Sequence, residues 1–123
     1  MSHRADPVVA ASRVIGDVPT LAAATDTRAV ATVGRTLIRP GGTNVIASGM
    51  SFWLDIRHED DAVVDRVLDA ISTRAREHAA ETGVSVSISQ ESYSPTTRFT
   101  AELNDRLRSV LPDAPMLPSG AGH

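Results

Sequence analysis

The sequence has no cysteine and no lysine, and only four of its 123 residues are aromatic. Without cysteine, neither a disulfide nor a thiolate metal site can form. Scarce aromatic rings, a net charge of −3 and the lack of a dense basic stretch argue against a nucleic-acid surface. No run of about 18 apolar residues occurs, and the first residues do not resemble a signal peptide. We therefore expect a cytoplasmic protein without a membrane span.

The length suits one domain with a modest core, and the first expected element is a helix. The Asp-Pro pair at 6–7 marks its start, because Asp caps free N–H groups and Pro suits the first helical position. Apolar spacing predicts an amphipathic helix over 7–15. Gly16 and Pro19 are expected to interrupt it, with a further helical turn over 20–24.

Two strands and a turn are predicted next. Many β-branched residues favour a strand over 29–39, and Pro40 followed by paired glycines favours a turn over 39–43. Residues 44–57 alternate between two sets of side chains, which predicts a second strand with one apolar face. The two segments are expected to form an antiparallel hairpin.

The remaining sequence predicts a long helix, a strand and a short helix. Residues 60–82 carry one apolar stripe, and Gly83 is well placed as the C-terminal cap. Strict alternation of apolar residues with serine predicts a half-buried strand over 84–90. Thr100 is expected to cap a last helix over 101–111. The expected buried side of that helix consists of Leu103, Leu107, Val110 and Leu111.

This order of elements predicts an α+β fold, a ferredoxin-like two-layer sandwich with an antiparallel sheet and helices on one face. A complete unit of this kind begins with a strand that is central in the sheet, and the chain lacks that first strand. Its absence leaves two sheet pieces with unpaired edges. Either the pieces close up or another chain supplies the pairing, and we expect self-association.

The acidic stretch after the second strand allows two interpretations. His58, Glu59, Asp60 and Asp61 are conceivable as a local metal site, because imidazole and carboxylate groups are metal ligands. A solvated helix start is the simpler interpretation, because acidic residues are favoured at the positive end of the helix dipole. The sequence favours the helix start.

Arg57 also allows two interpretations. It forms either a surface ion pair with Asp55 or Glu59, or a fork that holds a substrate carboxylate through two parallel hydrogen bonds. Asn44 could add an amide donor, but it converges with Arg57 only if a bulge intervenes or if Asn44 lies in the turn. A small-residue loop at 119–123 could let backbone N–H groups approach an anion, although composition alone favours a flexible tail.

Several short motifs follow one another along the chain. They are Val33-Gly34-Arg35, Arg39-Pro40, Asn44-Val45-Ile46, Leu54-Asp55-Ile56-Arg57-His58, Asp60-Asp61 and Pro118-Ser119-Gly120-Ala121-Gly122-His123. Together they resemble the lid domain of the N-carbamoyl-L-amino-acid hydrolase and allantoate amidohydrolase group, in the M20 metallopeptidase-like family. The last of them resembles the beginning of that group's PSGAGHDA motif. The resemblance covers nearly the whole chain, in the right order.

The resemblance implies that residues 1–111 are the lid and dimerisation domain and that residues 112–123 return towards a catalytic domain. The parent enzyme would hydrolyse linear amide C–N bonds of N-carbamoyl-L-amino acids or allantoate-like ureido compounds. Two divalent metal ions (zinc, manganese or cobalt) would be held by that catalytic domain, and none by this chain. The chain alone is therefore expected to be inactive.

The resemblance further implies a homodimer formed through the lid sheet and helix, and a small ureido or carboxylate substrate. No residue of this chain is expected to be catalytic, and only one of two glycines is expected near the substrate. The substrate-binding residues carried over by motif are Asn44, Arg57, Gly120, Gly122 and His123. The alternative is a free-standing α+β module that dimerises or binds a small ligand without catalysis.

Overall fold

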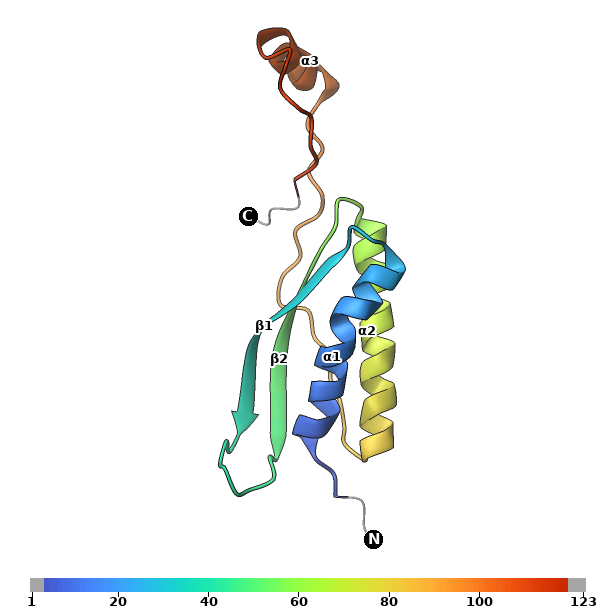
Figure 1. Cartoon of the computed structure of the whole chain (residues 1–123), viewed down its shortest axis with the longest axis vertical. Helices are drawn as coiled ribbons and strands as arrows, with labels where there is room; N and C mark the ends of the chain where they lie inside the picture. The colour runs from blue at the N-terminus through green and yellow to red at the C-terminus, as the bar shows by residue number, and fades with distance from the viewer. Residues whose placement is uncertain (1–3, 120–123) are drawn as a thin grey trace.

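The computed structural model describes residues 4–119. Its elements are α1 (Pro7–Thr25), β1 (Val30–Arg39), β2 (Gly49–Arg57), α2 (Asp61–Thr82) and α3 (Ala101–Val110). Figure 1 shows the antiparallel hairpin β1–β2 with α1 and α2 side by side on one face, while α3 stands apart beyond the end of this layer. The predicted α+β fold, with helices on one face of an antiparallel sheet, is confirmed.

Helix α1 begins where the sequence predicts but continues past the expected break. Asp6 caps it by accepting hydrogen bonds from two backbone N–H groups of the first turn. The predicted interruption at Gly16 and Pro19 is wrong, because the helix runs through both residues. An interior proline costs about 3 kcal/mol, and burial of one face of the helix offsets that cost. The buried residues of this face are Ala10, Val14, Val18 and Ala22.

Helix α1 is also long and apolar enough to cross a membrane, judged by length and composition alone. Its apolar residues have a place inside the domain, because they form one core cluster with residues of α2. The buried members of that cluster are Val14, Val18, Ala22, Val63, Val67, Ile71 and Ala75. Part of the apolar character of α1 therefore serves the core, and the larger part of the helix is not buried.

The hairpin turns one face towards the helices and the other face away from them. Its register pairs Val30 with Arg57 and Arg39 with Gly49, and it shifts at Gly34. The predicted apolar face of the second strand is confirmed where β2 contacts the core, through Phe52, Leu54 and Ile56. On the outer face, the guanidinium carbon of Arg35 lies 4.2 Å from the centre of the Trp53 ring.

Strand β2 begins at Gly49 and not at residue 44 as predicted. Residues 40–48 form a loop instead, which opens with a cis bond between Arg39 and Pro40. Ser48 closes this loop, because its backbone N–H donates to the carbonyl oxygen of Arg39 at 2.8 Å. Alternation over 44–48 therefore does not mark a strand, since these residues belong to a closed turn.

Helix α2 and its caps agree with the prediction. Asp60 accepts a hydrogen bond from the backbone N–H of Ala62, and Gly83 ends the helix in the left-handed conformation at φ 69°. Val67 is fully buried and Ile71 nearly so. The core thus lies between α1, α2 and the inner face of the hairpin.

The chain after α2 differs more from the prediction. The expected strand over 84–90 is wrong, because these residues are extended but pair with no strand. A strand needs a hydrogen-bonding neighbour, and no backbone–backbone hydrogen bond in the described chain involves residues 85–99. Helix α3 forms almost as predicted, with Thr100 as its cap. Its expected buried side is exposed, because no other described element packs against it.

Candidate functional site

The predicted carboxylate-binding residue Arg57 ends strand β2 on the outer face of the hairpin. Its Nε lies 2.6 Å from Asp55 Oδ2, which confirms the predicted ion pair with this neighbour. The Arg57 side chain is 48% exposed, and its two Nη groups have no partner among residues 4–119. These two nitrogens are therefore available to a planar anion.

His58, the next residue, is buried at the junction of β2 and α2, although the sequence suggested a solvated helix start. Its side chain is 2% exposed, and its Nδ1 accepts the backbone N–H of Asp60 at 2.9 Å. The Nε2 atom lies 3.5 Å from Asp26 Oδ1 and makes no hydrogen bond within the described chain. The backbone N–H of Arg28 lowers the pKa of Asp26, and the nearby charges of His58 and Arg28 act in the same direction.

The acidic residues of this stretch are each engaged by a different neighbour. Glu59 contacts the guanidinium of Arg28, and Asp61 accepts hydrogen bonds from the hydroxyl and the backbone N–H of Thr96. These two bonds hold the pKa of Asp61 below its ordinary value. Within residues 4–119, no three His, Asp or Glu side chains are arranged to hold a metal ion. The metal site considered for residues 58–61 therefore does not fit the geometry.

Asn44 lies in the loop between the strands, which is one of the two placements that the sequence allowed. Gly41 has a left-handed backbone at φ 75°, and a Cβ on Gly42 would lie 2.7 Å from a methyl group of Val45. The backbone therefore favours glycine at position 41, and a side chain at position 42 would have to displace that of Val45. Asn44 is exposed, and its amide has no partner in the part of the chain that the structure describes. A hollow of about 380 Å³ lies beside it, between this loop and the start of α1.

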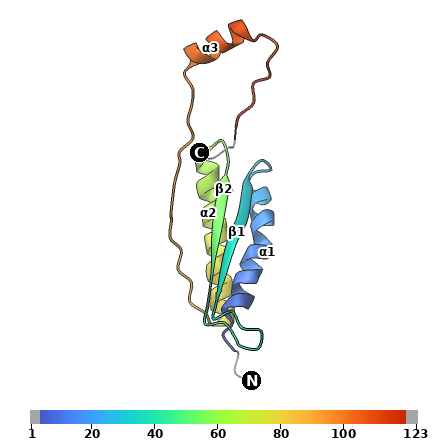
Figure 2. The same ribbon diagram turned by 90° about the vertical axis from the view of Figure 1, so that its left-hand side faces the viewer.

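Arg57 and the Asn44 loop lie at opposite ends of the hairpin (Figures 1 and 2). Strand β2 spans roughly 26 Å at about 3.3 Å per residue, and Asn44 lies beyond its first residue. The bulge at Gly34 belongs to β1 and does not bring the two together. Asn44 and Arg57 therefore cannot hold one carboxylate within a single chain. The remaining predicted residues, Gly120, Gly122 and His123, lie outside the described residues.

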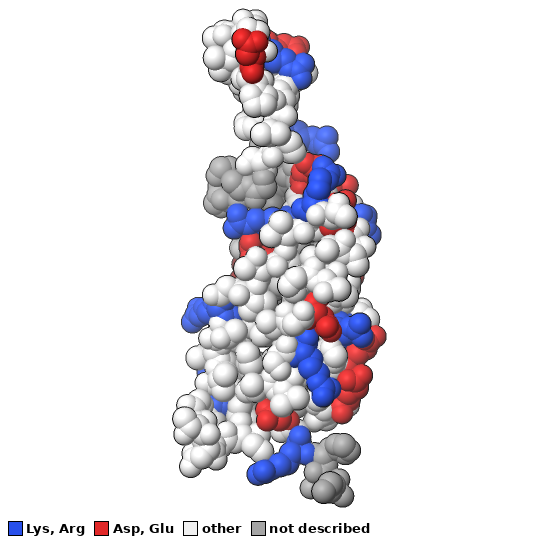
Figure 3. All heavy atoms as spheres, viewed as in Figure 1, with Lys and Arg blue, Asp and Glu red and all other residues white. Residues whose placement is uncertain are grey.

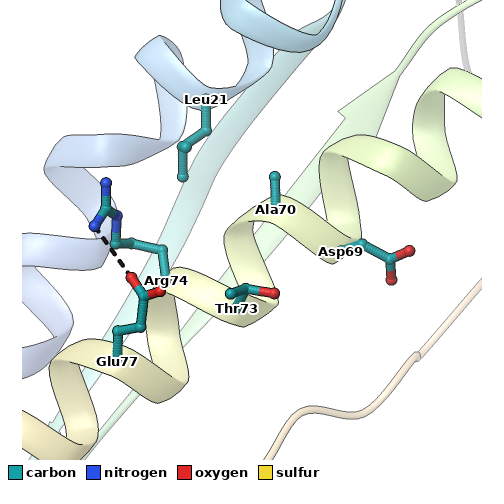
Figure 4. A pocket seen from close by; sticks show the side chains of 6 residues that line it. All are labelled: Leu21, Asp69, Ala70, Thr73, Arg74 and Glu77. Atoms are coloured by element: carbon teal, nitrogen blue, oxygen red, sulfur yellow. Dashed lines mark hydrogen bonds and ion pairs between the residues drawn. The ribbon is translucent and has the colours of Figure 1, made fainter.

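A second hollow, of about 360 Å³, lies between α1 and α2, and Figure 4 shows the residues that line it. Arg74 is central, with its Nη1 lying 3.1 Å from Glu77 Oε2 and its Nε lying 3.3 Å from Asp17 Oδ2. These charges pair with one another across the two helices. Arg74 therefore joins the two helices at this hollow.

Sequence reasoning missed the surroundings of Arg57. Thr96 lies 35 positions from Asp61, and no local pattern signals a contact over such a separation. Asp26 and Arg28 reach the same end of the hairpin from the connection between α1 and β1. On the face shown in Figure 3, acidic and basic side chains intermingle, and no continuous basic surface is visible there.

No family model matches the chain, but individual proteins do. The N-carbamoyl-L-amino acid amidohydrolase of Geobacillus stearothermophilus is 35% identical over 127 residues, which cover all of this chain and 31% of that protein. A protein of Oryza sativa subsp. japonica named "Probable allantoate deiminase" is 31% identical over 76% of this chain and 22% of its own length. The crystal structure of a hydantoinase/carbamoylase family amidase from Burkholderia ambifaria matches with a TM-score of 0.84 and 33% identity, over all of this chain and 31% of that one.

The chain thus has an α+β fold and matches a part of longer proteins that are named amidohydrolases or amidases. Over its whole length the chain is similar to part of proteins named as amidases of the hydantoinase/carbamoylase family. It spans about 31% of the length of the curated relatives that it matches over its whole length. This similarity agrees with the resemblance that the sequence motifs carry.

Proposed function

We propose that this chain is the lid and dimerisation part of an enzyme that hydrolyses N-carbamoyl-L-amino acids or allantoate-like ureido compounds. Residues 1–111 would cover and orient the substrate, and residues 112–123 would lead back to a catalytic domain. The zinc, manganese or cobalt chemistry of the parent enzyme would be supplied by residues outside this chain. The chain itself would position a reactant without breaking a bond.

The observation that carries the proposal is the separation of two free donors along one hairpin. Among residues 4–119, the two Nη groups of Arg57 have no partner at one end, and the Asn44 amide has none at the other. A carboxylate is only a few ångström wide, so one chain cannot apply both donors to it. In a two-fold symmetric dimer, however, opposite ends of two hairpins can meet. Each substrate site would then take Arg57 from one copy and Asn44 from the other.

In this arrangement Arg57 is a positioning residue. Its guanidinium stays charged at any working pH, so it binds and orients a carboxylate but transfers no proton. Hydrogen bonds to a charged group contribute about 1.5–3 kcal/mol each. Fixing the substrate carboxylate in this way lowers the entropy cost of bringing the scissile bond to the reacting groups.

The experiment places this chain in the Geobacillus relative, in exchange for the 31% of that protein that it matches. The chimera should hydrolyse N-carbamoyl-L-amino acids, and Arg57→Ala should raise KM by about tenfold or more. Arg35→Ala is the matched control, because Arg35 lies on the same face of the hairpin but stacks on Trp53. Equal effects of the two substitutions would remove the case for Arg57.

A mixed dimer tests the shared site directly. One copy carries Arg57→Ala and the other Asn44→Ala, each with a different affinity tag so that the mixed species can be purified. If each site draws on both copies, one of the two sites is intact, and about half of the parental activity should return. If both donors come from the same copy, every site is damaged and activity stays at the level of the single variants.

A further inference from the structure

We propose that His58 is a positioning residue for Arg57. Its neutral imidazole, with the proton on Nε2, ties the end of β2 to Asp26 in the connection between α1 and β1. This tie keeps the Arg57 guanidinium on the outer face of the hairpin, where it can meet a carboxylate. The consequence for a substrate rests on the function proposed above, whereas the tie itself can be tested on this chain alone.

Arg57 and His58 are neighbours in the chain with opposite surroundings. The Arg57 side chain is 48% exposed, and that of His58 is 2% exposed. Among the described residues, Asp55 is the partner that holds the guanidinium, through a bond to Nε. Asp55 is itself 60% exposed, and exposed ion pairs fix a geometry only weakly. The buried imidazole is therefore the firmer attachment for this end of the strand.

The contacts of the imidazole decide where its proton lies. Nδ1 accepts the backbone N–H of Asp60 at 2.9 Å, so Nε2 is the donor of the neutral ring. Nε2 is buried, has no hydrogen-bond partner among the described residues, and lies 3.5 Å from Asp26 Oδ1. A buried N–H without an acceptor is costly, and Asp26 is the carboxylate that faces it. At this distance the charge of the carboxylate provides the attraction, because a short hydrogen bond needs a closer approach.

Asp26 is held by its own contacts and can serve as an anchor. Its backbone N–H donates to the carbonyl oxygen of Ala22 at 3.1 Å, where α1 ends. Its Oδ1 accepts the backbone N–H of Arg28 at 2.8 Å. This hydrogen bond is the largest cause of the lowered pKa of Asp26, and the nearby His58 and Arg28 lower it further. The carboxylate is therefore ionised at neutral pH and fixed in direction.

The two tied connections flank the last residue pair of the hairpin. Arg57 pairs with Val30, which is the first residue of β1. Val30 follows the connection that contains Asp26, and both connections lie at the same end of the hairpin (Figure 1). A contact between His58 and Asp26 thus closes a small loop around this pair. It opposes the fraying that is expected at the end of a two-stranded sheet.

A second link joins the same two connections and provides a matched control. Glu59 contacts the guanidinium of Arg28, whose side chain is 65% exposed. Because exposed ion pairs contribute little, Glu59→Gln should leave Arg57 in place. If the junction needs any link between the two connections, Glu59→Gln and a substitution of His58 should act alike.

Two variants separate the two nitrogens of the His58 ring. An asparagine side chain accepts the backbone N–H two residues further on, so His58→Asn can keep the bond to Asp60 but does not reach Asp26. A glutamine side chain is longer and ends in an amide donor, so His58→Gln can place an N–H near the position of Nε2. A role in positioning Arg57 through Asp26 predicts that His58→Gln preserves it and His58→Asn does not.

The first experiment is NMR on the full 123-residue chain. Spectra of the ring nitrogens should show neutral His58 with its proton on Nε2. Relaxation of the Arg57 Nε–H group measures its fast motion, which should increase in His58→Asn and stay unchanged in His58→Gln and Glu59→Gln. A neutral ring with its proton on Nδ1 would overturn the proposal, as would equal motion in all these variants.

Asp26→Asn tests the tie from its other end. An amide oxygen can still accept the N–H of Arg28, while the charge that faces Nε2 is lost. The Arg57 Nε–H group should gain motion as it does in His58→Asn, and unchanged motion would contradict the tie. Circular dichroism checks folding, and Asp26→Asn decides the question if His58→Asn does not fold.

The second experiment measures kinetics in the chimera with the Geobacillus relative. His58→Asn should raise KM about fivefold or more and change kcat by less than about twofold, because it disturbs the orientation of a binding group. In an Arg57→Ala background the same substitution should have no further effect, since no guanidinium is left to position. Fully additive effects would overturn the proposal. If Arg57→Ala itself leaves KM unchanged, the proposed function fails, and the motion of Arg57 in the isolated chain still decides the role of His58.

Discussion

Strand β2 and residues 84–90 share an alternating pattern, yet only one of them is part of a sheet. In β2, Phe52, Leu54 and Ile56 pack on the core, and β1 pairs with the strand along its length. In the later segment, Val86 and Ile88 alternate with serine in the same way but stay exposed. The pattern produces an extended chain with two different sides. Whether that chain becomes a strand depends on a neighbour with free hydrogen-bonding groups.

The helices repeat the contrast. Helix α2 buries Val67 and Ile71 against α1 and the hairpin, whereas α3 exposes Leu107 and Val110. Both helices have an N-cap and an apolar side. Local signals are therefore sufficient for the helix itself, and packing requires a partner surface. The packed layer over 7–82 and the chain after it should respond very differently to the same kind of substitution.

The largest expected effect comes from a charge placed in the packed layer. Val67 is 0% exposed, so Val67→Asp would bury an unpaired carboxylate. We expect a loss of about 3–5 kcal/mol in the free energy of unfolding, which is enough to unfold a small domain. Thermal and urea denaturation followed by circular dichroism measure it. Leu107→Asp in α3 is the control, and a comparable loss there would show that α3 is packed.

Two glycine-to-alanine substitutions should change the free energy of unfolding in opposite directions. Gly83 joins the packed layer to the extended segment at φ 69°, where an alanine side chain costs about 1–2 kcal/mol. Gly16 lies inside α1 with open space around its Cβ position, so Gly16→Ala should stabilise the chain by about 0.5–1 kcal/mol. Urea denaturation of both variants compares them. A stabilising Gly83→Ala would contradict the left-handed cap.

Much of this fold can be predicted from the sequence, because most of its signals are local. Gly83 and Thr100 are recognisable as caps, and the hairpin follows from its strand pattern and its turn residues. The continuation of α1 through Pro19 could not be predicted. It depends on the free energy of burying a helix face against α2, which outweighs the local cost of the proline.

The candidate site is less predictable from the sequence than the fold. Motif resemblance selects Asn44 and Arg57, but their separation along β2 becomes clear only when the strand boundaries are known. The burial of His58 could not be predicted either. Its position before an acidic stretch suggests an exposed side chain, whereas that side chain is 2% exposed and lies against Asp26 in the connection between α1 and β1. Such contacts join residues far apart in the chain, and no short pattern encodes them.

A smaller effect is expected where the extended segment touches the packed layer. Hydrogen bonds from Thr96 lower the pKa of Asp61 below 3.8, its ordinary value. Because the pKa of Asp61 is lower in the folded chain than in the unfolded chain, the ionised carboxylate stabilises the folded state. This stabilisation is fully present above the pKa of the unfolded chain, and it is lost as the pH falls through the pKa of the folded chain. The contact should therefore open below about pH 4. Thr96→Val should raise the pKa of Asp61 towards its ordinary value.

An NMR titration of the side-chain carboxyl groups measures this shift. Asp26 is the internal control, because the backbone N–H of Arg28 and not Thr96 is the largest cause of its lowered pKa. The Thr96→Val substitution should leave the Asp26 titration unchanged. If the pKa of Asp61 also stays where it is, the contact between the segment and the start of α2 does not exist in solution.

The smallest effect is expected from removing α3. A chain that ends at residue 100 loses six large apolar residues that are 45–81% exposed, namely Leu103, Leu107, Val110, Leu111, Met116 and Leu117. Because burial and not composition stabilises a fold, the midpoint of thermal unfolding should change by less than about 2 °C. A shift as large as that of a core substitution would mean that α3 packs on the domain or on a second copy. Repeating the measurement at several protein concentrations separates these two cases, since only association makes the midpoint depend on concentration.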